Sequence, residues 1–147
     1  EDYAYQMSGI GGGNFLILGE NLGSVLKACE TAVKSIAELN NLILPFPGGV
    51  VRSGSKVGSK YKNLIASTNF EYCPNLKKVV NSKLKKNMKA VLEIVIDGIS
   101  FNDISNAMKI GIQSIIKAKL SGIIAISAGN YGGKLGPHLF YLRNILK

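Results

Sequence analysis

The sequence has few of the side chains that build metal centres. It contains two cysteines, one histidine and no tryptophan in 147 residues. One histidine excludes a multi-histidine site, and neither Cys29 nor Cys73 belongs to a CxxC pair or has a histidine nearby. Because zinc sites require such groupings, we expect two free thiols and no metal ion.

Long apolar runs are also absent. No window approaches the roughly 18 consecutive apolar residues of a membrane span, and the opening EDYAYQ does not have the pattern of a signal peptide. We therefore expect a cytoplasmic protein that does not bind a membrane. Because the first residue is Glu1 rather than Met, we expect the chain to be a processed or truncated piece.

Acidic residues are scarce: 9 of them face 18 lysines and arginines, for a formal net charge of +9. Such a balance suits nucleic acid or anionic small molecules. The densest basic run, residues 75–89, lacks interleaved aromatic residues for base stacking, so we interpret it as a solvated connection. With 46% hydrophobic residues, the chain is expected to form one globular domain.

Two glycine-rich stretches fail the nucleotide-binding templates. In ISAGNYGGKLGPH (126–138), Ala128 stands where a P-loop needs its first glycine, and Leu135 stands where it needs Ser or Thr. In GIGGGN (9–14), Asn14 replaces the third glycine of the dinucleotide fingerprint, and the strand follows the glycines instead of preceding them. The second stretch is expected to be a flexible approach to a strand or a close backbone contact.

A third stretch, SGSKVGSKYK (53–62), contains Gly-Ser-Lys twice. Backbone N–H groups, hydroxyls and ammonium groups together form a plausible cradle for an anion. A solvated loop is the alternative interpretation.

Hydrophobic periodicity predicts the element order βαββαβ. Strands are expected over 14–18, 90–96 and 122–127, and an extended segment bent by Pro45 and Pro47 supplies the remaining strand. This order is typical of an α+β, ferredoxin-like domain, in which two helices cover one face of an antiparallel sheet. The end of the chain, LFYLRNIL, fits either an extra strand or a short helix.

Two amphipathic helices are expected between these strands. Ser100 and Asp103 form a capping box that begins the second helix, and the first is expected to end near residues 40 and 41. The apolar stripe of the first helix is Leu22, Val25, Leu26, Cys29, Val33 and Ile36, and that of the second is Phe101, Ile104, Met108, Ile112 and Ile115.

Glu93 interrupts a strand that is apolar on both faces. In AVLEIVI, Glu93 shares one face with Val91 and Val95. A buried carboxylate without partners is costly, so the group must pair with a cation, open into a cleft or take up a proton, which would raise its pKa. A protonated carboxyl could act as a general acid; a cross-strand pair with a lysine is the structural alternative.

Four separated motifs resemble formylmethanofuran:tetrahydromethanopterin formyltransferases. They are GIGGGNFLILGE, LPFPGGVVRSGSKVGSKYK, VLEIVIDG and ISAGNYGGKLG. The resemblance covers nearly the whole chain in the same order, but only the carboxyl-terminal (distal) half of the family, whose members consist of two ferredoxin-like lobes. It implies that residues 1–147 are a single lobe, with the amino-terminal lobe of the enzyme as a partner.

The resemblance implies an acyltransferase of archaeal one-carbon metabolism and methanogenesis. It would move a formyl group from N-formylmethanofuran to N5 of tetrahydromethanopterin, both of them co-substrates, without a prosthetic group. The family acts as homo-oligomers, and the isolated chain is expected to be inactive or weakly active. Glu93 occupies the place of the proposed catalytic acid, and the lysine-containing loops suit the anionic tails of the carriers. Implied substrate contacts are Ser53, Ser55, Lys56, Lys60, Tyr61, Asn130, Tyr131 and Lys134.

Two other functions remain open at this point. The chain could be a non-catalytic lobe or subunit that binds a partner or a pterin-like cofactor. Ferredoxin-like sheets also bind RNA, but the predicted strands carry one aromatic residue, Phe15, and not the aromatic pair of an RRM. We therefore do not expect a nucleic acid partner.

Overall fold

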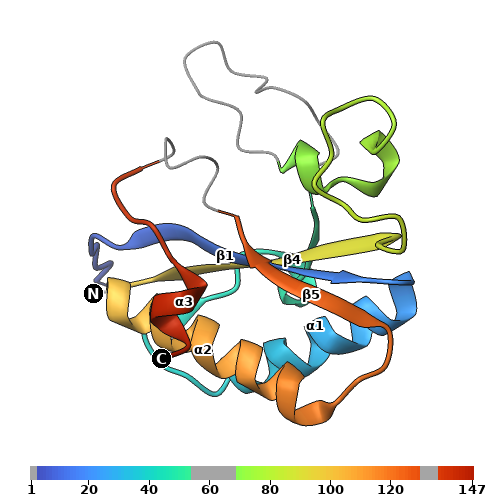
Figure 1. Cartoon of the computed structure of the whole chain (residues 1–147). Helices are drawn as coiled ribbons and strands as arrows, with labels where there is room; N and C mark the ends of the chain where they lie inside the picture. Colours follow the sequence, from blue (N-terminus) through green and yellow to red (C-terminus); the bar gives the residue numbers. More distant parts are fainter. Residues whose placement is uncertain (1–2, 54–68, 130–135) are drawn as a thin grey trace.

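The computed structural model describes residues 3–53, 69–129 and 136–147. Its elements follow the predicted order, with the second strand divided in two and a short helix near the end of the chain (Figure 1). The strands and helices are β1 (Ile10–Gly19), α1 (Leu22–Ile36), β2 (Leu42–Ile43), β3 (Val51–Arg52), β4 (Ala90–Gly98), α2 (Phe101–Ala118), β5 (Ile123–Ala128) and α3 (Leu142–Ile145).

The strands form one antiparallel sheet in the order β2-β4-β1-β5, with β3 also paired to β4. Helices α1 and α2 lie together on one face of this sheet, and residues 69–89 lie on the other face (Figure 1). The predicted α+β class, with an antiparallel sheet and two helices on one face, is therefore confirmed.

The second strand is divided because its two prolines interrupt the pairing with β4. Ile43 pairs with Asp97 and Val51 pairs with Glu93, so residues 44–50 bulge out opposite residues 94–96. Pro47 begins a 3-10 turn, Pro47–Gly49, within this bulge. A proline removes one donor from a strand ladder, which explains the bend that the sequence predicted.

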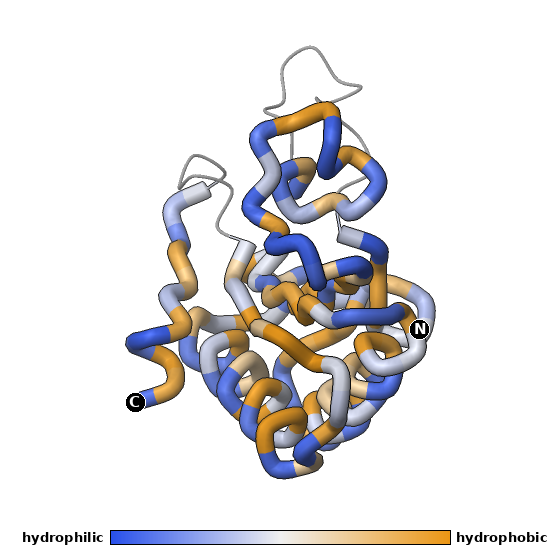
Figure 2. The backbone as a smooth tube through the Cα atoms, turned by 45° about the vertical axis from the view of Figure 1, so that its right-hand side comes forward, coloured by the Kyte–Doolittle hydropathy of each residue, from blue (hydrophilic) through white to orange (hydrophobic). Residues whose placement is uncertain are grey.

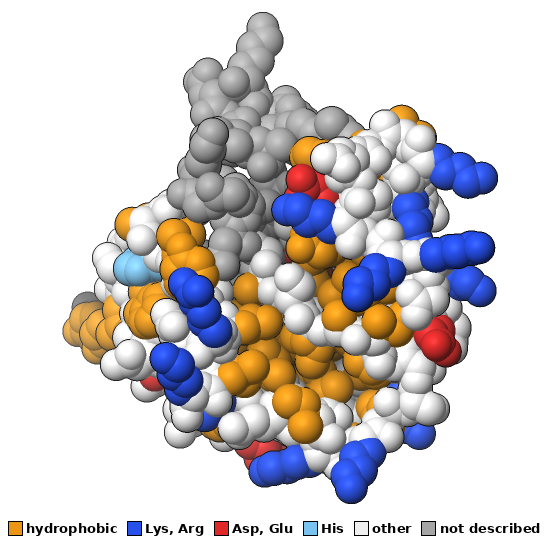
Figure 3. Space-filling model, viewed as in Figure 1, with side chains coloured by type: hydrophobic (Ala, Val, Ile, Leu, Met, Phe, Trp, Pro, Cys, Tyr) orange, Lys and Arg blue, Asp and Glu red, His pale blue; other side chains and the backbone are white. Residues whose placement is uncertain are grey.

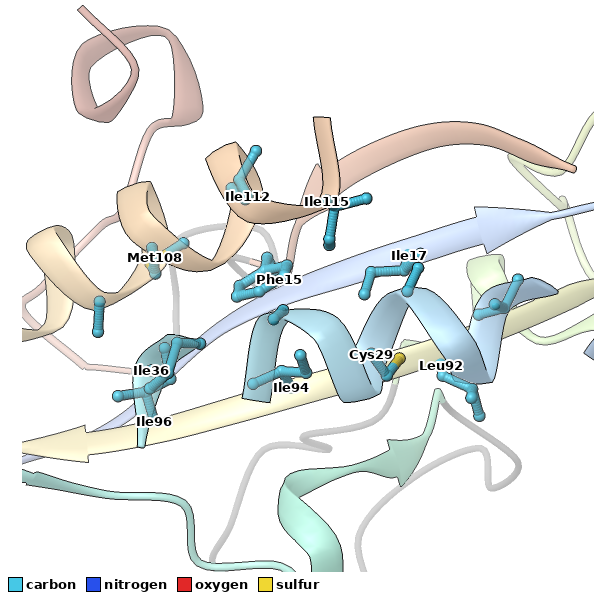
Figure 4. Packing of buried hydrophobic residues seen from close by; sticks show 14 of the residues in the cluster. Phe15, Ile17, Cys29, Ile36, Leu92, Ile94, Ile96, Met108, Ile112 and Ile115 are labelled. Carbon is cyan, nitrogen blue, oxygen red and sulfur yellow. The ribbon is translucent and has the colours of Figure 1, made fainter. Parts of the chain in front are cut away.

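The main core lies between the sheet and the two helices (Figure 4). Small residues let the helices approach closely: a Cβ on Gly111 would lie 2.7 Å from Cδ1 of Ile36. The prediction for α1 was wrong at Leu22 and Leu26, which are 61% and 41% exposed. Of the predicted stripe, α1 buries Val25, Cys29 and Ile36, and it buries Ala28 and Ala32 in addition.

Both helices begin at a side-chain cap. Asn21 accepts a hydrogen bond from the backbone N–H of Ser24 at 2.9 Å. At α2 the predicted capping box is present: Asp103 N–H donates to Ser100 Oγ at 3.1 Å, and Ser100 N–H donates to Asp103 Oδ2 at 3.0 Å. Phe101 lies outside the core and is 38% exposed. These caps satisfy backbone donors that a helix start leaves without partners.

The face of the sheet opposite the helices carries a second, smaller core. Its buried members are Leu16, Leu18, Leu84, Met88 and Val91. Two of them, Leu84 and Met88, belong to residues 69–89, here called the arm, which alternates between hydrophilic and hydrophobic stretches (Figure 2). The arm is therefore more than the solvated connection that we predicted.

The basic side chains of the arm nevertheless face solvent. Its exposed lysines are Lys78, Lys83, Lys85, Lys86 and Lys89. Figure 3 shows basic side chains gathered over the part of the molecule where the arm lies. Lys83 forms an ion pair with Glu71 of the same arm, with Nζ 2.5 Å from Oε2.

Two smaller predictions also have an outcome. Cys29 and Cys73 are both free and buried, as their spacing indicated. The ambiguous end of the chain contains the short helix α3 rather than another strand. Among the described residues, no helix has the length and apolar character needed to cross a membrane.

Candidate functional site

Glu93 lies at the middle of β4, on the face of the sheet that the helices leave uncovered. Its cross-strand neighbours are Leu16 on β1 and Val51 on β3, so no lysine stands directly opposite it. The side chain is only 4% exposed. The alternative of a cross-strand ion pair on an open sheet face therefore does not describe this position.

Two asparagine amides contact the Glu93 carboxyl group. Asn14 Nδ2 donates to Oε1, and Asn69 Nδ2 donates to Oε2 at 3.3 Å. Both asparagines are themselves buried, at 4% and 8% exposure. Burial of a carboxyl group is tolerated when its oxygens are hydrogen-bonded, and this pair of amides supplies one donor to each oxygen.

Asn14 is positioned by the irregular start of β1. The pairing of β1 with β4 shifts between Ile10 and Gly13, and Gly12 adopts a positive φ of 85°. The N–H of Gly12 donates to Asp97 Oδ1 at 2.7 Å, which fixes this bulge. From Gly13 onwards the register is regular, so Asn14 lies on the same face as Glu93.

Gly13 is a close backbone contact, one of the two alternatives expected for residues 9–14, whereas a Cβ on Gly12 would meet nothing within 4 Å. A Cβ on Gly13 would lie 2.2 Å from Cγ2 of Ile104 and 3.4 Å from Cε2 of Phe140. Gly13 therefore allows β1 to pass directly over helix α2.

Gly129, which follows β5, lies against both amides. A Cβ at this position would be 2.7 Å from Nδ2 of Asn14 and 2.9 Å from Nδ2 of Asn69. Distances below 3.0 Å are not found for real Cβ atoms. Part of the glycine-rich sequence after β5 is therefore explained: the first glycine leaves room for the amides that hold Glu93.

A pocket of about 340 Å³ opens beside Asn14. Its walls are the glycine-rich start of β1, Gly129 and the segment 136–140, which includes His138. Among the described residues that line it there is no lysine, arginine, aspartate or glutamate. Five of these eleven residues are glycines, whose peptide groups can donate and accept hydrogen bonds without carrying charge.

Ser53 is the described member of the predicted substrate-binding set. It follows β3 and is completely buried, and its Oγ has no hydrogen-bond partner among the described residues. The other predicted contacts lie outside the described residues: they are Ser55, Lys56, Lys60, Tyr61, Asn130, Tyr131 and Lys134.

The asparagines were not predicted as part of the site. Asn14 gave a weak signal. It begins the apolar run NFLIL, and the alternation of side chains along a strand places it on the sheet face that carries the Glu93 carboxyl group. Asn69 gave none, because it reaches Glu93 only through the path of the arm. Among the described residues there is no group of three or more His, Cys, Asp or Glu that could hold a metal ion.

The arrangement can bind a proton and deliver it at a sheltered position. A buried carboxyl group next to a backbone-lined pocket is suited to general acid and base chemistry on a ligand held there. The fold and the site together define an α+β domain in which the sheet face opposite the helices buries one hydrogen-bonded glutamate.

Comparison with known proteins identifies the family. Residues 1–145 match the family model described as "FTR, proximal lobe". The chain therefore belongs to the formylmethanofuran–tetrahydromethanopterin formyltransferase family. The family's own term for this lobe, proximal, replaces the word distal used above for the carboxyl-terminal half.

Relatives named formylmethanofuran–tetrahydromethanopterin formyltransferase support this assignment. The protein of Methylococcus capsulatus is 56% identical over 138 residues, which are 93% of this chain and 46% of the relative. That of Methanocaldococcus jannaschii is 48% identical over 143 residues, which are 95% and 47% of the two chains. The chain thus spans about half the length of the curated relatives that it matches.

Solved structures agree. The formyltransferase of Methanosarcina barkeri has a TM-score of 0.81 at 48% identity, covering 93% of this chain and 46% of that one. The formyltransferase/hydrolase complex of Methylorubrum extorquens, solved with methylofuran, also has a TM-score of 0.81, at 44% identity and with 95% and 46% coverage.

Proposed function

We propose that the chain forms the part of a formyltransferase that carries its acid–base group. The reaction would transfer a formyl group from N-formylmethanofuran to N5 of tetrahydromethanopterin, the carriers in the names of the relatives. The observation that carries the proposal is the Glu93 carboxyl, buried between Asn14 and Asn69 beside a pocket. A family member needs such a group because amines are poor leaving groups until they are protonated.

The proposed reaction passes through a tetrahedral intermediate. The secondary amine N5 attacks the formyl carbon, a C–N bond forms and the carbonyl oxygen gains negative charge. Glu93 donates its proton to the nitrogen of the methanofuran amine, and the C–N bond to that nitrogen breaks. The proton lost from N5 returns to Glu93, so the carboxyl group ends the cycle as it began.

Substrate binding is proposed to involve the two stretches of sequence 53–62 and 126–138. Ser53, Ser55, Lys56, Lys60 and Tyr61 would act from the first stretch and Asn130, Tyr131 and Lys134 from the second, with the lysines meeting the anionic tails of the carriers. The pocket next to Asn14, whose described lining residues include no lysine, arginine, aspartate or glutamate, would receive an uncharged part of a carrier. We further propose that the complete site requires the remaining half of the enzyme and a homo-oligomer.

Replacement of Glu93 by Gln tests the proposal. The chain is supplied with the remaining half of a relative, and formyl transfer is followed with both carriers present. Glu93→Gln keeps size but removes the transferable proton, so we expect turnover to fall roughly 10²-fold or more while folding and carrier binding persist. The matched control is Glu38→Gln, an exposed position after α1, which should keep full turnover.

The alternative function is a lobe that binds a carrier without performing chemistry. It would be favoured if Glu93→Gln retained its turnover per folded molecule, or if the assembled wild-type protein bound a carrier and transferred no formyl group. Isothermal titration calorimetry with each carrier separates binding from turnover.

A further inference from the structure

The two amides at Glu93 are chemically suited to more than one protonation state of the carboxyl group. An ionised carboxylate only accepts hydrogen bonds, whereas a protonated carboxyl also donates one. A side-chain amide has a donor end and an acceptor end of nearly equal size. Asn14 and Asn69 contact different oxygens of Glu93, so each oxygen has its own amide.

We propose that Asn14 and Asn69 are positioning residues that keep the Glu93 carboxyl hydrogen-bonded both when it carries a proton and when it does not. With the carboxylate ionised, both Nδ2 groups donate. With one oxygen protonated, the amide beside that oxygen turns end for end, and its Oδ1 accepts the O–H. The proposal rests on the proposed function, in which Glu93 gives up a proton and takes one back in each cycle.

The geometry favours Asn69 as the amide that turns. Its hydrogen bond to Oε2 is 3.3 Å long, near the weak end of the usual range. It belongs to the arm, and it precedes the 3-10 turn Phe70–Tyr72, whereas Asn14 lies within the paired strand β1. Gly129 lies against both amides and presents no Cβ that would clash with either of them.

Among the described residues, the titratable groups near Glu93 come from the arm and not from the neighbouring strands. From β1 the facing side chains are Asn14 and Leu16, and from β3 the facing side chain is Val51, none of which titrates. From the arm come Tyr72, which packs against the smaller core, and the Glu71–Lys83 ion pair. The lysines of the arm point to solvent on the same side of the molecule.

Replacement of Asn69 tests the proposal on the chain alone. Asn69→Asp preserves shape but removes the donor, and it adds a second carboxyl that must share a proton with Glu93. We expect the pH at which Glu93 loses its proton to rise by about one unit or more. Asn69→Leu, which removes donor and acceptor at similar volume, should raise it by less. The measurement is NMR of 13C-labelled glutamate carboxyls, with Glu93→Gln identifying the signal.

The matched control is Asn106→Asp, an exposed position on α2, on the far side of the sheet from Glu93. It adds the same charge and should leave the titration of Glu93 unchanged. Backbone amide spectra verify that each variant is folded. If Asn69→Asp does not fold, Asn14→Asp is the second variant, with the same expected rise.

A second readout separates positioning from simple stability. In the assembled enzyme, Asn69→Asp should move the pH profile of kcat to higher pH in step with the titration, with KM for the carriers unchanged. An unmoved titration in folded Asn69→Asp or Asn14→Asp overturns the proposal. A moved titration with an unmoved pH profile overturns the role in turnover. If the assembled wild type transfers no formyl group, only the proposed function fails. The titration of Glu93 still tests whether Asn14 and Asn69 position its carboxyl group.

Discussion

Substitution of Gly129 by Ala should disturb the candidate site directly. The new Cβ would lie 2.7 Å from Asn14 Nδ2 and 2.9 Å from Asn69 Nδ2, where ordinary contacts begin at 3.4 Å. Each amide must therefore withdraw by about half an ångström or more. The bond from Asn69 to Glu93 is already 3.3 Å long, so a shift of this size removes it.

Two destabilising effects and one stabilising effect set the expected change in the free energy of unfolding. Overpacking costs about 1–3 kcal/mol, and a hydrogen bond to a charged group contributes about 1.5–3 kcal/mol. Replacing glycine by alanine restricts the unfolded chain, which returns about 0.4–1 kcal/mol. Because partial relaxation reduces the first two terms, we expect the free energy of unfolding to fall by about 1–3 kcal/mol.

Urea denaturation of the chain measures this change, and side-chain amide NMR signals report on Asn14 and Asn69. Gly23→Ala is the control: its Cβ would lie 3.5 Å from Asn21 Oδ1, an ordinary contact, within helix α1. Alanine there should be neutral or stabilise by up to about 1 kcal/mol. If Gly129→Ala matches the wild type in stability and leaves both amide signals unmoved, the described packing around Glu93 is incorrect.

Two further predictions concern the core and α2. Burial, with a smaller contribution from Glu30, raises the pKa of the Cys29 thiol from 9.0 to about 12, so Cys29 should resist alkylation in the folded chain and react after unfolding. Since the folded-state pKa lies above the unfolded value, the contribution of Cys29 to stability is fully present below about pH 9 and is lost as the pH rises towards 12. Unfolding midpoints at two alkaline pH values, compared with those of Cys29→Ala, check that this contribution falls as the pH rises. Ser100→Ala removes the cap of α2 and should lower the free energy of unfolding by about 0.5–2 kcal/mol, with turnover per folded molecule unchanged; a loss of turnover in folded protein would contradict the separation of α2 from the site.

The sequence was most informative where a residue violated the local pattern. Glu93 could be singled out because a carboxyl group in an apolar strand needs a special environment. Pro45 and Pro47 predicted a bend in the second strand, and the strand divides there because proline cannot complete a ladder. The exposure of Leu22 and Leu26 could not be predicted, since the close approach of α1 to α2 selects small residues and displaces the larger leucines from the interface.

The partners of Glu93 were the least predictable part of the site. Asn69 is separated from Glu93 by an arm with little regular secondary structure, and its contact depends on where Leu84 and Met88 anchor that arm to the sheet. No periodicity encodes such a path. In the sequence, Gly129 and Gly13 were recognisable only as members of glycine-rich stretches. Each position excludes a Cβ because of a close contact with residues that are distant in sequence.

The bulge that Asp97 stabilises at Gly12 has a consequence for a chain that folds with the wrong register of β1. Strand β1 sends Phe15 and Ile17 into the helix-covered core and Asn14 and Leu16 to the opposite side. A shift of the strand register by one residue would place Asn14 in the hydrophobic core and move Phe15 out of it. The same alignment therefore sets both the packing of the core and the contact of Asn14 with Glu93. A misaligned chain would lose both and be unstable, which exposes it to proteolysis before it can accumulate.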